Sequence, residues 1–133
     1  MTKNKAGALV GHYSADQLFK IEPRVKELAD LDVEVVADMD STNMDRKQWE
    51  QLIDLIVKNY SKYDGFLVTC GTNTMAYASS AMSFALKDIG KPVVFTGAQI
   101  PAEVINTDAH NNFVNALRVA TMDIAGVFVV FGS

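Results

Sequence analysis

Short apolar runs alternate along this chain with longer segments in which apolar residues recur at helical spacing. The runs are rich in Val and Phe, and they are continuous or nearly so. Runs of this kind are typical of parallel strands that are covered on both faces. We therefore predict four parallel strands, at residues 33–37, 66–69, 93–96 and 127–131.

Helices are predicted between these strands. The segment 75–86 is apolar on most sides and is expected to pack against both the sheet and a neighbouring helix. An earlier helix is expected from Ser14, which suits an N-cap, and Pro23 interrupts or restarts it. Two further segments place apolar residues at i, i+3, i+4 and i+7. They carry Trp49, Leu52, Ile53, Ile56 and Tyr60 in one and Phe113, Ala116, Leu117 and Ala120 in the other.

The alternation of strands and helices predicts an α/β fold. It is a doubly wound, mainly parallel sheet with right-handed crossovers and helices on both faces. The chain has 133 residues, of which 49% are hydrophobic, enough for one core but not for two independent domains. We therefore expect a single domain over residues 1–133.

Charge and hydropathy exclude several classes of partner. The net charge is -4, from 12 basic and 16 acidic residues without a basic run, which argues against nucleic acid and against an anionic membrane surface. The longest apolar stretch, 127–131, is too short to cross a bilayer, and the first residues lack the apolar core of a signal peptide. A cytoplasmic location and a small-molecule or protein partner are expected.

Cofactor and metal signatures are missing from the sequence. Cys70 is the only cysteine and is expected to be a small buried side chain, and His12 and His110 do not have a metal-ligand spacing. No Gly-x-Gly-x-x-Gly follows a predicted strand, and the loops lack the aromatic residues of a flavin site. We expect neither a cofactor nor a metal.

Polar residues follow three of the predicted strands. The loops read Asp-Met-Asp-Ser-Thr-Asn-Met at 38–44, Cys-Gly-Thr-Asn at 70–73 and Gly-Ala-Gln-Ile-Pro at 97–101. Ligands of such sheets bind at the carboxyl ends of the strands. The second loop also enters a helix, whose free N–H groups favour a carboxylate or an oxyanion. These loops predict a site for a small anionic molecule.

Each loop also has an ordinary structural interpretation. Ser41 or Asn43 is a natural cap for a helix that starts at Asp45. Residues 71–73 are a plausible strand-to-helix turn, and Gly97 and Pro101 are common in loops. Taken singly, the loops leave both interpretations open.

Taken in order, four blocks resemble a known family. They are Met-Asp-Ser-x-Asn-Met at 39–44, Gly-Thr-Asn-Thr-Met-Ala-Tyr at 71–77, Phe-Thr-Gly-Ala-Gln-Ile-Pro at 95–101 and Thr-Asp-Ala-His-Asn-Asn-Phe-x-Asn-Ala-Leu at 107–117. Together they resemble the amino-terminal domain of L-asparaginases, and Gly-Ala-Gln-Ile-Pro is most similar to the cytoplasmic, type I branch. The resemblance runs from about residue 18 to residue 132. The asparaginase-like subunit of the archaeal amidotransferase that makes glutaminyl-tRNA shares these blocks and is an alternative.

The resemblance implies an amidohydrolase that converts L-asparagine and water to L-aspartate and ammonia through a threonine acyl-enzyme. Carried over by position, Ser41 binds the α-carboxylate of the substrate and Asp40 its α-amino group. Thr72 supports proton transfer, and Asn73 stands where the family has an aspartate. The implied site comprises the catalytic residues Thr72 and Asn73 and the substrate-binding residues Asp40, Ser41, Thr42, Gly71, Thr72, Asn73 and Ala98.

Other parts of the family pattern are missing. The nucleophile segment Thr-Gly-Gly-Thr-Ile does not occur in the sequence, and we expect the first strand that carries it to be absent as well. Met1 resembles an internal methionine, and the family's lysine would lie beyond Ser133. Ala8 or a neighbour stands where the family often has a mobile loop tyrosine, and Tyr13 is the nearest candidate for that tyrosine. We therefore expect an amino-terminal domain truncated at both ends and inactive alone.

Two consequences follow from these departures. The neutral Asn73 lacks a charge that would face the substrate's ammonium, and a hydrogen bond to a charged group contributes about 1.5–3 kcal/mol, or roughly ten- to a hundredfold in affinity. A missing first strand would leave an unpaired position in the sheet and exposed apolar surface, which predicts a homo-oligomer. A catalytically silent binding or oligomerisation module is the remaining alternative.

Overall fold

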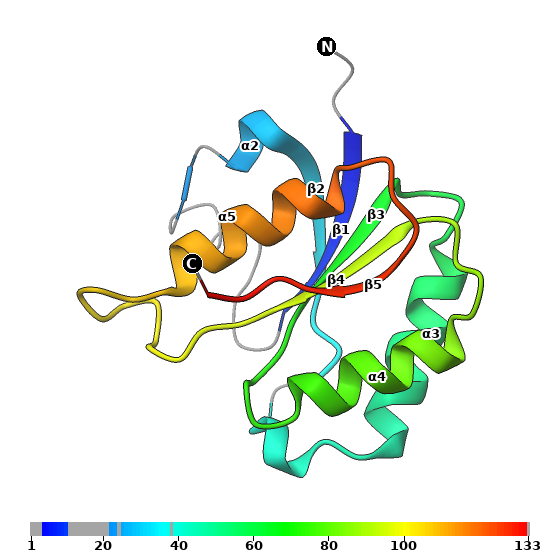
Figure 1. The fold of residues 1–133 in the computed structure, drawn as a ribbon, viewed down its shortest axis with the longest axis horizontal. Helices are drawn as coiled ribbons and strands as arrows, with labels where there is room; N and C mark the ends of the chain where they lie inside the picture. The colour runs from blue at the N-terminus through cyan, green and yellow to red at the C-terminus, as the bar shows by residue number, and fades with distance from the viewer. Residues whose placement is uncertain (1–3, 11–21, 24, 38, 133) are drawn as a thin grey trace.

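The computed structural model describes residues 4–10, 22, 23, 25–37 and 39–132. Within them, five parallel strands form one sheet in the order β2-β1-β3-β4-β5 (Figure 1). The strands are β1 (Asn4–Val10), β2 (Ala29–Glu34), β3 (Gly65–Thr69), β4 (Pro92–Thr96) and β5 (Gly126–Val129). The helices are α2 (Val25–Leu28), the short 3-10 helix η1 (Ser41–Asn43), α3 (Arg46–Lys58), α4 (Met75–Ala85) and α5 (Ala109–Ala120).

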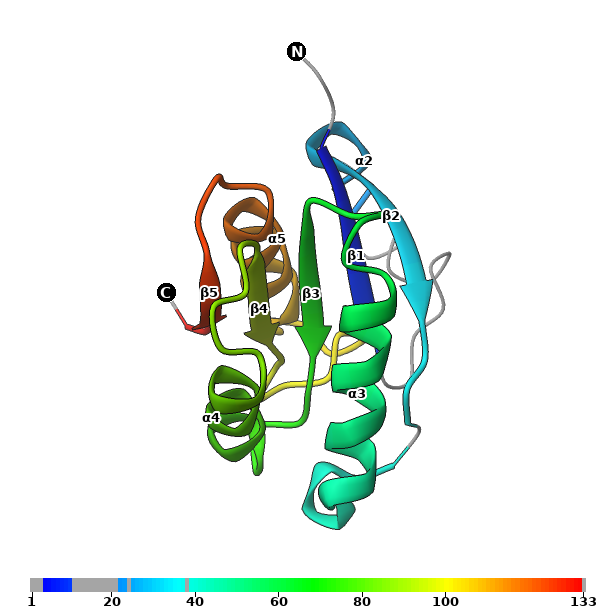
Figure 2. The same ribbon diagram turned by 90° about the vertical axis from the view of Figure 1, so that its right-hand side faces the viewer.

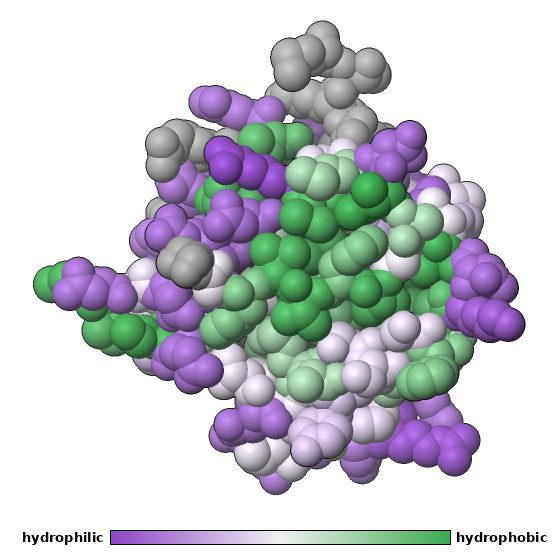
Figure 3. Space-filling view, viewed as in Figure 1, coloured by the Kyte–Doolittle hydropathy of each residue, from purple (hydrophilic) through white to green (hydrophobic). Residues whose placement is uncertain are grey.

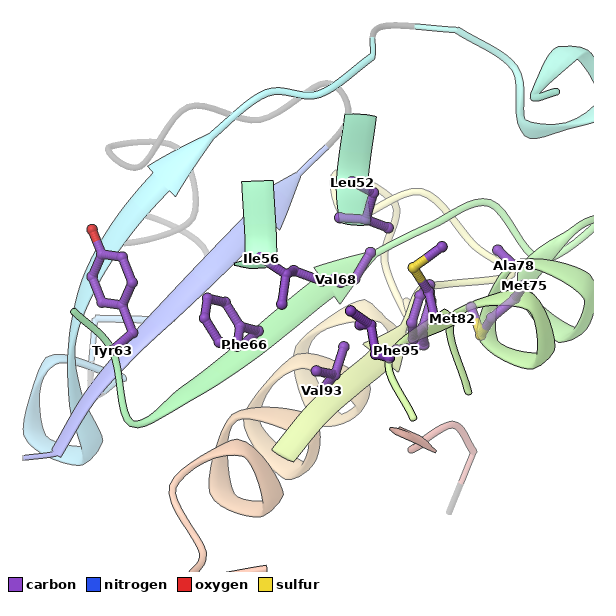
Figure 4. Packing of buried hydrophobic residues seen from close by; sticks show 11 residues of the cluster. Leu52, Ile56, Tyr63, Phe66, Val68, Met75, Ala78, Met82, Val93 and Phe95 are labelled. Atoms are coloured by element: carbon purple, nitrogen blue, oxygen red, sulfur yellow. The ribbon is translucent and has the colours of Figure 1, made fainter. Parts of the chain in front are cut away.

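Helices cover both faces of the sheet. Figure 2 shows α3 and α4 on one face and α2 and α5 on the other. Side chains alternate between the faces along a strand, so Leu67 and Val94 pack toward α5 while Phe66, Val68 and Phe95 pack toward α3 and α4. Figure 4 shows the hydrophobic cluster on the face covered by α3 and α4, in which the side chains of β3 and β4 point toward Leu52, Ile56 and Met82. The predicted doubly wound α/β fold with a parallel sheet is therefore confirmed.

Strands β3 and β4 lie where the sequence predicted them, β5 ends at Val129 instead of residue 131, and β2 begins and ends earlier than predicted. The run predicted at 33–37 is only partly a strand, because β2 ends at Glu34. In Ala29–Glu34 burial alternates, with Asp30, Asp32 and Glu34 exposed. This is the pattern of an edge strand with one solvated face, and a search for continuous apolar runs does not detect it.

The expected absence of a first strand is wrong for this structure. Strand β1 pairs with β2 from Asn4↔Ala29 to Leu9↔Glu34, and with β3 from Ala6↔Gly65 to Val10↔Thr69. It therefore fills the position that was predicted to be unpaired, and the N–H and C=O groups of β2 and β3 gain a neighbouring strand. The helix predicted from Ser14, together with His12 and Tyr13, lies outside the described residues.

The two predicted amphipathic helices are confirmed as α3 and α5. Leu52 and Ile56 of α3 are buried, whereas Tyr60 lies beyond the helix end. Helix α4 packs on β4 and β5 and against α3, as its apolar sequence predicted. Its outer side is nevertheless apolar as well, with Tyr77 and Phe84 exposed.

Strand β5 is an edge strand of the sheet. On the face shown in Figure 3, apolar side chains gather at the centre. Val129 of this strand is half exposed. No helix among the described residues is long and apolar enough to span a membrane.

Leu67 offers a test of the sheet's central role. This residue of β3 is fully buried and packs against α5. Leu67→Ala should therefore lower the free energy of unfolding by about 2–5 kcal/mol, because contacts are lost and a cavity remains. The measurement is urea denaturation followed by circular dichroism. Val57→Ala on the exposed side of α3 is the control, and its effect should stay within about 0.5 kcal/mol. Equal effects of the two substitutions would contradict the packing described.

Candidate functional site

A cavity of about 420 Å³ lies at the carboxyl ends of β3 and β4, beside the segment that follows β2. The loops that line it come from three separate parts of the chain, as the sequence predicted. The predicted site residues among its lining residues are Asp40, Ser41, Gly71, Thr72, Asn73 and Ala98. Thr42 is not among the residues that line it.

The position of the cavity follows from the order of the strands. Strands β1 and β3 are neighbours, but α2 after β1 and α4 after β3 cover opposite faces of the sheet. The connections therefore diverge, and parallel α/β sheets bind ligands in the crevice at such a point.

Ser41 is held at the wall of the cavity by its backbone. It is 6% exposed, and its carbonyl oxygen accepts hydrogen bonds from Thr74 Oγ1 at 3.2 Å and from Met44 N at 3.0 Å. A Cβ atom on Gly71 would lie only 2.3 Å from Ser41 Oγ and 2.6 Å from Ser41 Cβ. Glycine at 71 is therefore what lets the two loops meet.

Asp40 supplies the charge of the site. Its Oδ1 accepts hydrogen bonds from Thr42 N at 2.8 Å and Thr42 Oγ1 at 2.7 Å, and these bonds lower the pKa of the carboxyl group. Asp40 is thus ionised at neutral pH, and it is the only charged side chain among the described residues that line the cavity. Thr42 contributes by fixing this carboxylate.

The capping interpretation of the first loop is wrong, whereas residues 71–73 do lie in a strand-to-helix turn between β3 and α4. Helix α3 is capped by Asp45, whose side chain accepts from Lys47 N at 2.8 Å, while Gln48 Oε1 accepts from Asp45 N at 3.0 Å. Thr74 occupies the N-cap position of α4, but no side chain there caps the helix. Its hydroxyl donates to Ser41 instead, so the start of α4 keeps N–H groups that favour an anion.

The exits of β3 and β4 are tied together by main chain. Cys70 N donates to Thr96 O at 2.8 Å, and a Cβ atom on Gly97 would lie 2.3 Å from Cys70 O. Burial raises the pKa of the Cys70 thiol, which favours the unreactive protonated form. Cys70 is half-buried and lines the cavity, so it is less buried than was predicted.

The sequence did not indicate which residues hold the loop that carries Ala98. The carboxylate of Asp108 accepts hydrogen bonds of 3.0 Å from Gln99 N and Ile100 N, and Asn112 is buried beside it. The backbone hydrogen bonds from Ile100 and Gln99 lower the pKa of Asp108. Both residues lie in the block 107–117, which was recognised as a whole but contributed no site residue.

The chemistry of the cavity is that of hydroxyls, amides and one carboxylate. Ser41, Thr72, Asn73 and Gln99 line it, together with Asp40. Such groups can hold a small molecule that carries a carboxylate, an amine or an amide. Among the residues that the structure describes, no group of three or more His, Cys, Asp or Glu could hold a metal ion.

Comparison with known proteins gives matches along the whole chain. Residues 1–133 match the family model described as Asparaginase, N-terminal. L-asparaginase 1 of Escherichia coli is 46% identical over 82 residues, which cover 62% of this chain and 24% of that protein. A glutamyl-tRNA(Gln) amidotransferase subunit of Methanosarcina acetivorans is 38% identical over 127 residues, 95% of this chain and 30% of that protein.

A solved structure agrees with these sequence matches. The probable cytoplasmic L-asparaginase from Campylobacter jejuni superposes with a TM-score of 0.86 and 29% sequence identity, over 96% of this chain and 46% of that chain. This chain therefore spans less than half the length of each of these relatives.

Gly71 provides a test of the contact between the loops. Gly71→Ala should lower the free energy of unfolding by about 1–3 kcal/mol, because the new methyl group overlaps Ser41. Gly90→Ala is the matched control, since the nearest atom there is the hydroxyl at the end of the Tyr60 side chain. Ser41→Gly should cost less stability in the Gly71→Ala protein than in the wild type. Additive effects in chemical denaturation would show that the two residues do not touch.

The hydrogen bonds of Asp108 make the stability of the protein depend on pH in the acidic range. Because its pKa is lowered in the folded state, the stabilisation is complete above the ordinary value of 3.8 and is lost as the pH falls through the lower folded value. Asp108→Asn should therefore destabilise the protein at neutral pH, and this difference should shrink below pH 3.8. Chemical denaturation between about pH 3 and 7 measures it. A carboxyl that titrates in NMR spectra at or above 3.8 would contradict the hydrogen bonding described.

Proposed function

Because the chain belongs to the asparaginase family, as its amino-terminal domain, we propose that it serves an L-asparaginase-type amidohydrolase and holds the substrate of that enzyme. The reaction is hydrolysis of the side-chain amide of L-asparagine to L-aspartate and ammonia. The observation that supports it most directly is that Ser41, Thr72 and Ala98, from three distant loops, line one cavity.

In the proposed position, the α-carboxylate and the α-ammonium group of the substrate each have a binding partner at the cavity. Ser41 and the uncapped start of α4 bind the α-carboxylate, since a hydroxyl and helix N–H groups stabilise an anion without placing a second charge in the cavity. The ionised Asp40 binds the α-ammonium group. Thr42 holds Asp40 in place through two hydrogen bonds to its carboxylate.

Thr72 and Ala98 are proposed to face the amide that is cleaved, and Asn73 to face the α-ammonium group. In the proposed reaction a threonine hydroxyl attacks the amide carbon, the C–N bond breaks with release of ammonia, and water then hydrolyses the ester. The attacking threonine is expected in a Thr-Gly-Gly-Thr-Ile segment, which the 133 residues do not contain. Thr72 is therefore assigned to support proton transfer, with Asn73 beside it, and Gly71 to bring this turn against Ser41.

A glutamine amide is the second candidate substrate. The amidotransferase relative aligns over 95% of this chain, whereas L-asparaginase 1 aligns over 62%. The amidotransferase match therefore includes more of the chain and supports an amide-hydrolysing role in which glutamine replaces asparagine. A catalytically silent binding or oligomerisation module is the third candidate, and it differs from both in predicting no amide hydrolysis by any longer form of the chain.

Location and assembly are proposed as well. A cytoplasmic location agrees with the description of the Campylobacter jejuni relative. A homo-oligomer stays a prediction, and its support is now the exposed apolar residues of α4 and β5 rather than an unpaired sheet position.

The binding proposal can be tested with the 133-residue chain. Isothermal titration and NMR spectra should show binding of L-aspartate, with shifted amide signals for Ser41, Thr72 and Asn73. A coupled ammonia assay should show no turnover of asparagine, because the attacking threonine is not in this chain. Tighter binding of glutamine than of asparagine would favour the amidotransferase role. Binding of neither amino acid nor aspartate would refute the proposal, and turnover would refute the assignment of the nucleophile.

Asn73 provides a sharper test of the charge balance. Asn73→Asp should tighten aspartate binding about ten- to a hundredfold, because it adds a carboxylate opposite the ammonium group. In a longer, active form of the enzyme the same change should lower KM. Asn106→Asp is the matched control, since the same change in an exposed residue outside the cavity should leave affinity unchanged. Unchanged or weaker binding by Asn73→Asp would mean that Asp40 alone satisfies the amine.

A further inference from the structure

The loop that carries Ala98 and Gln99 has an unusual internal support, the side chain of Asn112. Asn112 lies on α5 and is 2% exposed, although its side chain is polar. Its Nδ2 donates to Gly97 O at 3.0 Å and to Asp108 Oδ2 at 2.9 Å. Its Oδ1 accepts from Gly132 N at 3.0 Å. One buried amide therefore connects the exit of β4, the start of α5 and the segment after β5.

These bonds fix the cavity wall by two routes. The bond to Gly97 O holds the first residue of the loop directly, next to Ala98. The bond to Asp108 orients the carboxylate that accepts from Gln99 N and Ile100 N. The loop is thus held at its start and at its middle, and Asn112 takes part in both attachments.

We propose that Asn112 is a positioning residue of the site. Through its hydrogen bonds to Gly97 and Asp108 it fixes the position of the 97–100 loop, and this position determines the affinity of the cavity for its ligand. The effect on affinity rests on the proposed function, whereas the effect on the loop does not.

The chemistry at position 112 requires an amide. Two donors and one acceptor are used at once, a combination that Asn supplies and that Asp, Ser and Leu do not. An aspartate at 112 would keep an acceptor for Gly132 N but would face the Asp108 carboxylate and the Gly97 carbonyl without a proton to share. Both attachments of the loop would then be repulsive.

A purely structural role makes a different prediction. If Asn112 only filled a buried position, its loss would lower the stability of the whole domain and expose all amides equally. If it positions the loop, the amides of Gln99 and Ile100 should respond more than those at the centre of the sheet. Amide hydrogen exchange separates the two cases, because it reports each N–H individually.

The experiment measures amide exchange by NMR in wild type, Asn112→Asp and Asn112→Ala at one pH. Exchange at Gln99 and Ile100 should become faster by about tenfold or more relative to Leu67 and Val94 in the sheet. Asn111→Asp is the matched control, because it adds the same charge on the adjacent, exposed position of α5. Unchanged ratios in both Asn112 variants would overturn the proposal.

A measurement on the wild type covers the case in which the variants do not fold. The side-chain NH2 protons of Asn112 should exchange far more slowly than those of Asn111, because both protons on Asn112 Nδ2 donate within a buried network. Equal exchange at the two residues would overturn the proposal without any substitution.

Ligand binding tests the second half of the proposal. L-aspartate should bind the Asn112 variants about tenfold more weakly than the wild type or Asn111→Asp. Equal affinity, despite faster amide exchange in the loop, would overturn the claim that the position of the 97–100 loop sets the affinity for L-aspartate. If the wild type binds no aspartate, the proposed function fails, and the exchange data alone then decide whether Asn112 holds the loop.

Discussion

Strands β3 and β4 end at the same height in the sheet, and the candidate site depends on this register. Thr69 pairs with Thr96 at the last rung of the two strands, and the hydrogen bond from Cys70 N to Thr96 O extends the pairing by one residue. The two polar loops therefore leave the sheet side by side and at the same height. Gly97 lets them remain close, since any larger residue would meet Cys70 O. Parallel strands alone would bring the loops to the same edge, but only this register places Thr72 and Ala98 around one cavity.

The sequence predicted the parts of the fold in which the pattern is local. Strands β3, β4 and β5 are apolar runs, and α3 and α5 have clear helical spacing, so each could be recognised from its own residues. Strand β2 could not be placed correctly because Asp30, Asp32 and Glu34 are tolerated only at a solvated edge, a fact about its neighbours. Strand β1 was missed because its expected absence was inferred from a missing motif, and backbone pairing does not require that motif.

The candidate site divides in the same way between what the sequence shows and what the structure adds. Ser41, Thr72 and Ala98 lie in contiguous polar loops and were visible as motifs. Asp108 and Asn112 bind main-chain atoms of a loop that lies 8 and 15 residues earlier in the chain, and nothing in the spacing of residues 107–117 reveals which groups they bind. Thr74 likewise donates to Ser41 O, 33 positions earlier in the chain. Hydrogen bonds of this kind depend on the folded loop geometry, which local sequence does not specify.

The edge strand β5 has a practical consequence for work with this domain. Its sequence Gly-Val-Phe-Val contains neither a charged residue nor a proline, the features with which natural sheets protect their edges. Beside it, α4 exposes Phe84 and Tyr77. Strand addition between molecules is therefore favoured as concentration rises, during refolding and during crystallisation alike. A lysine introduced at Val129, whose side chain is half exposed, is the simplest change for keeping samples dispersed.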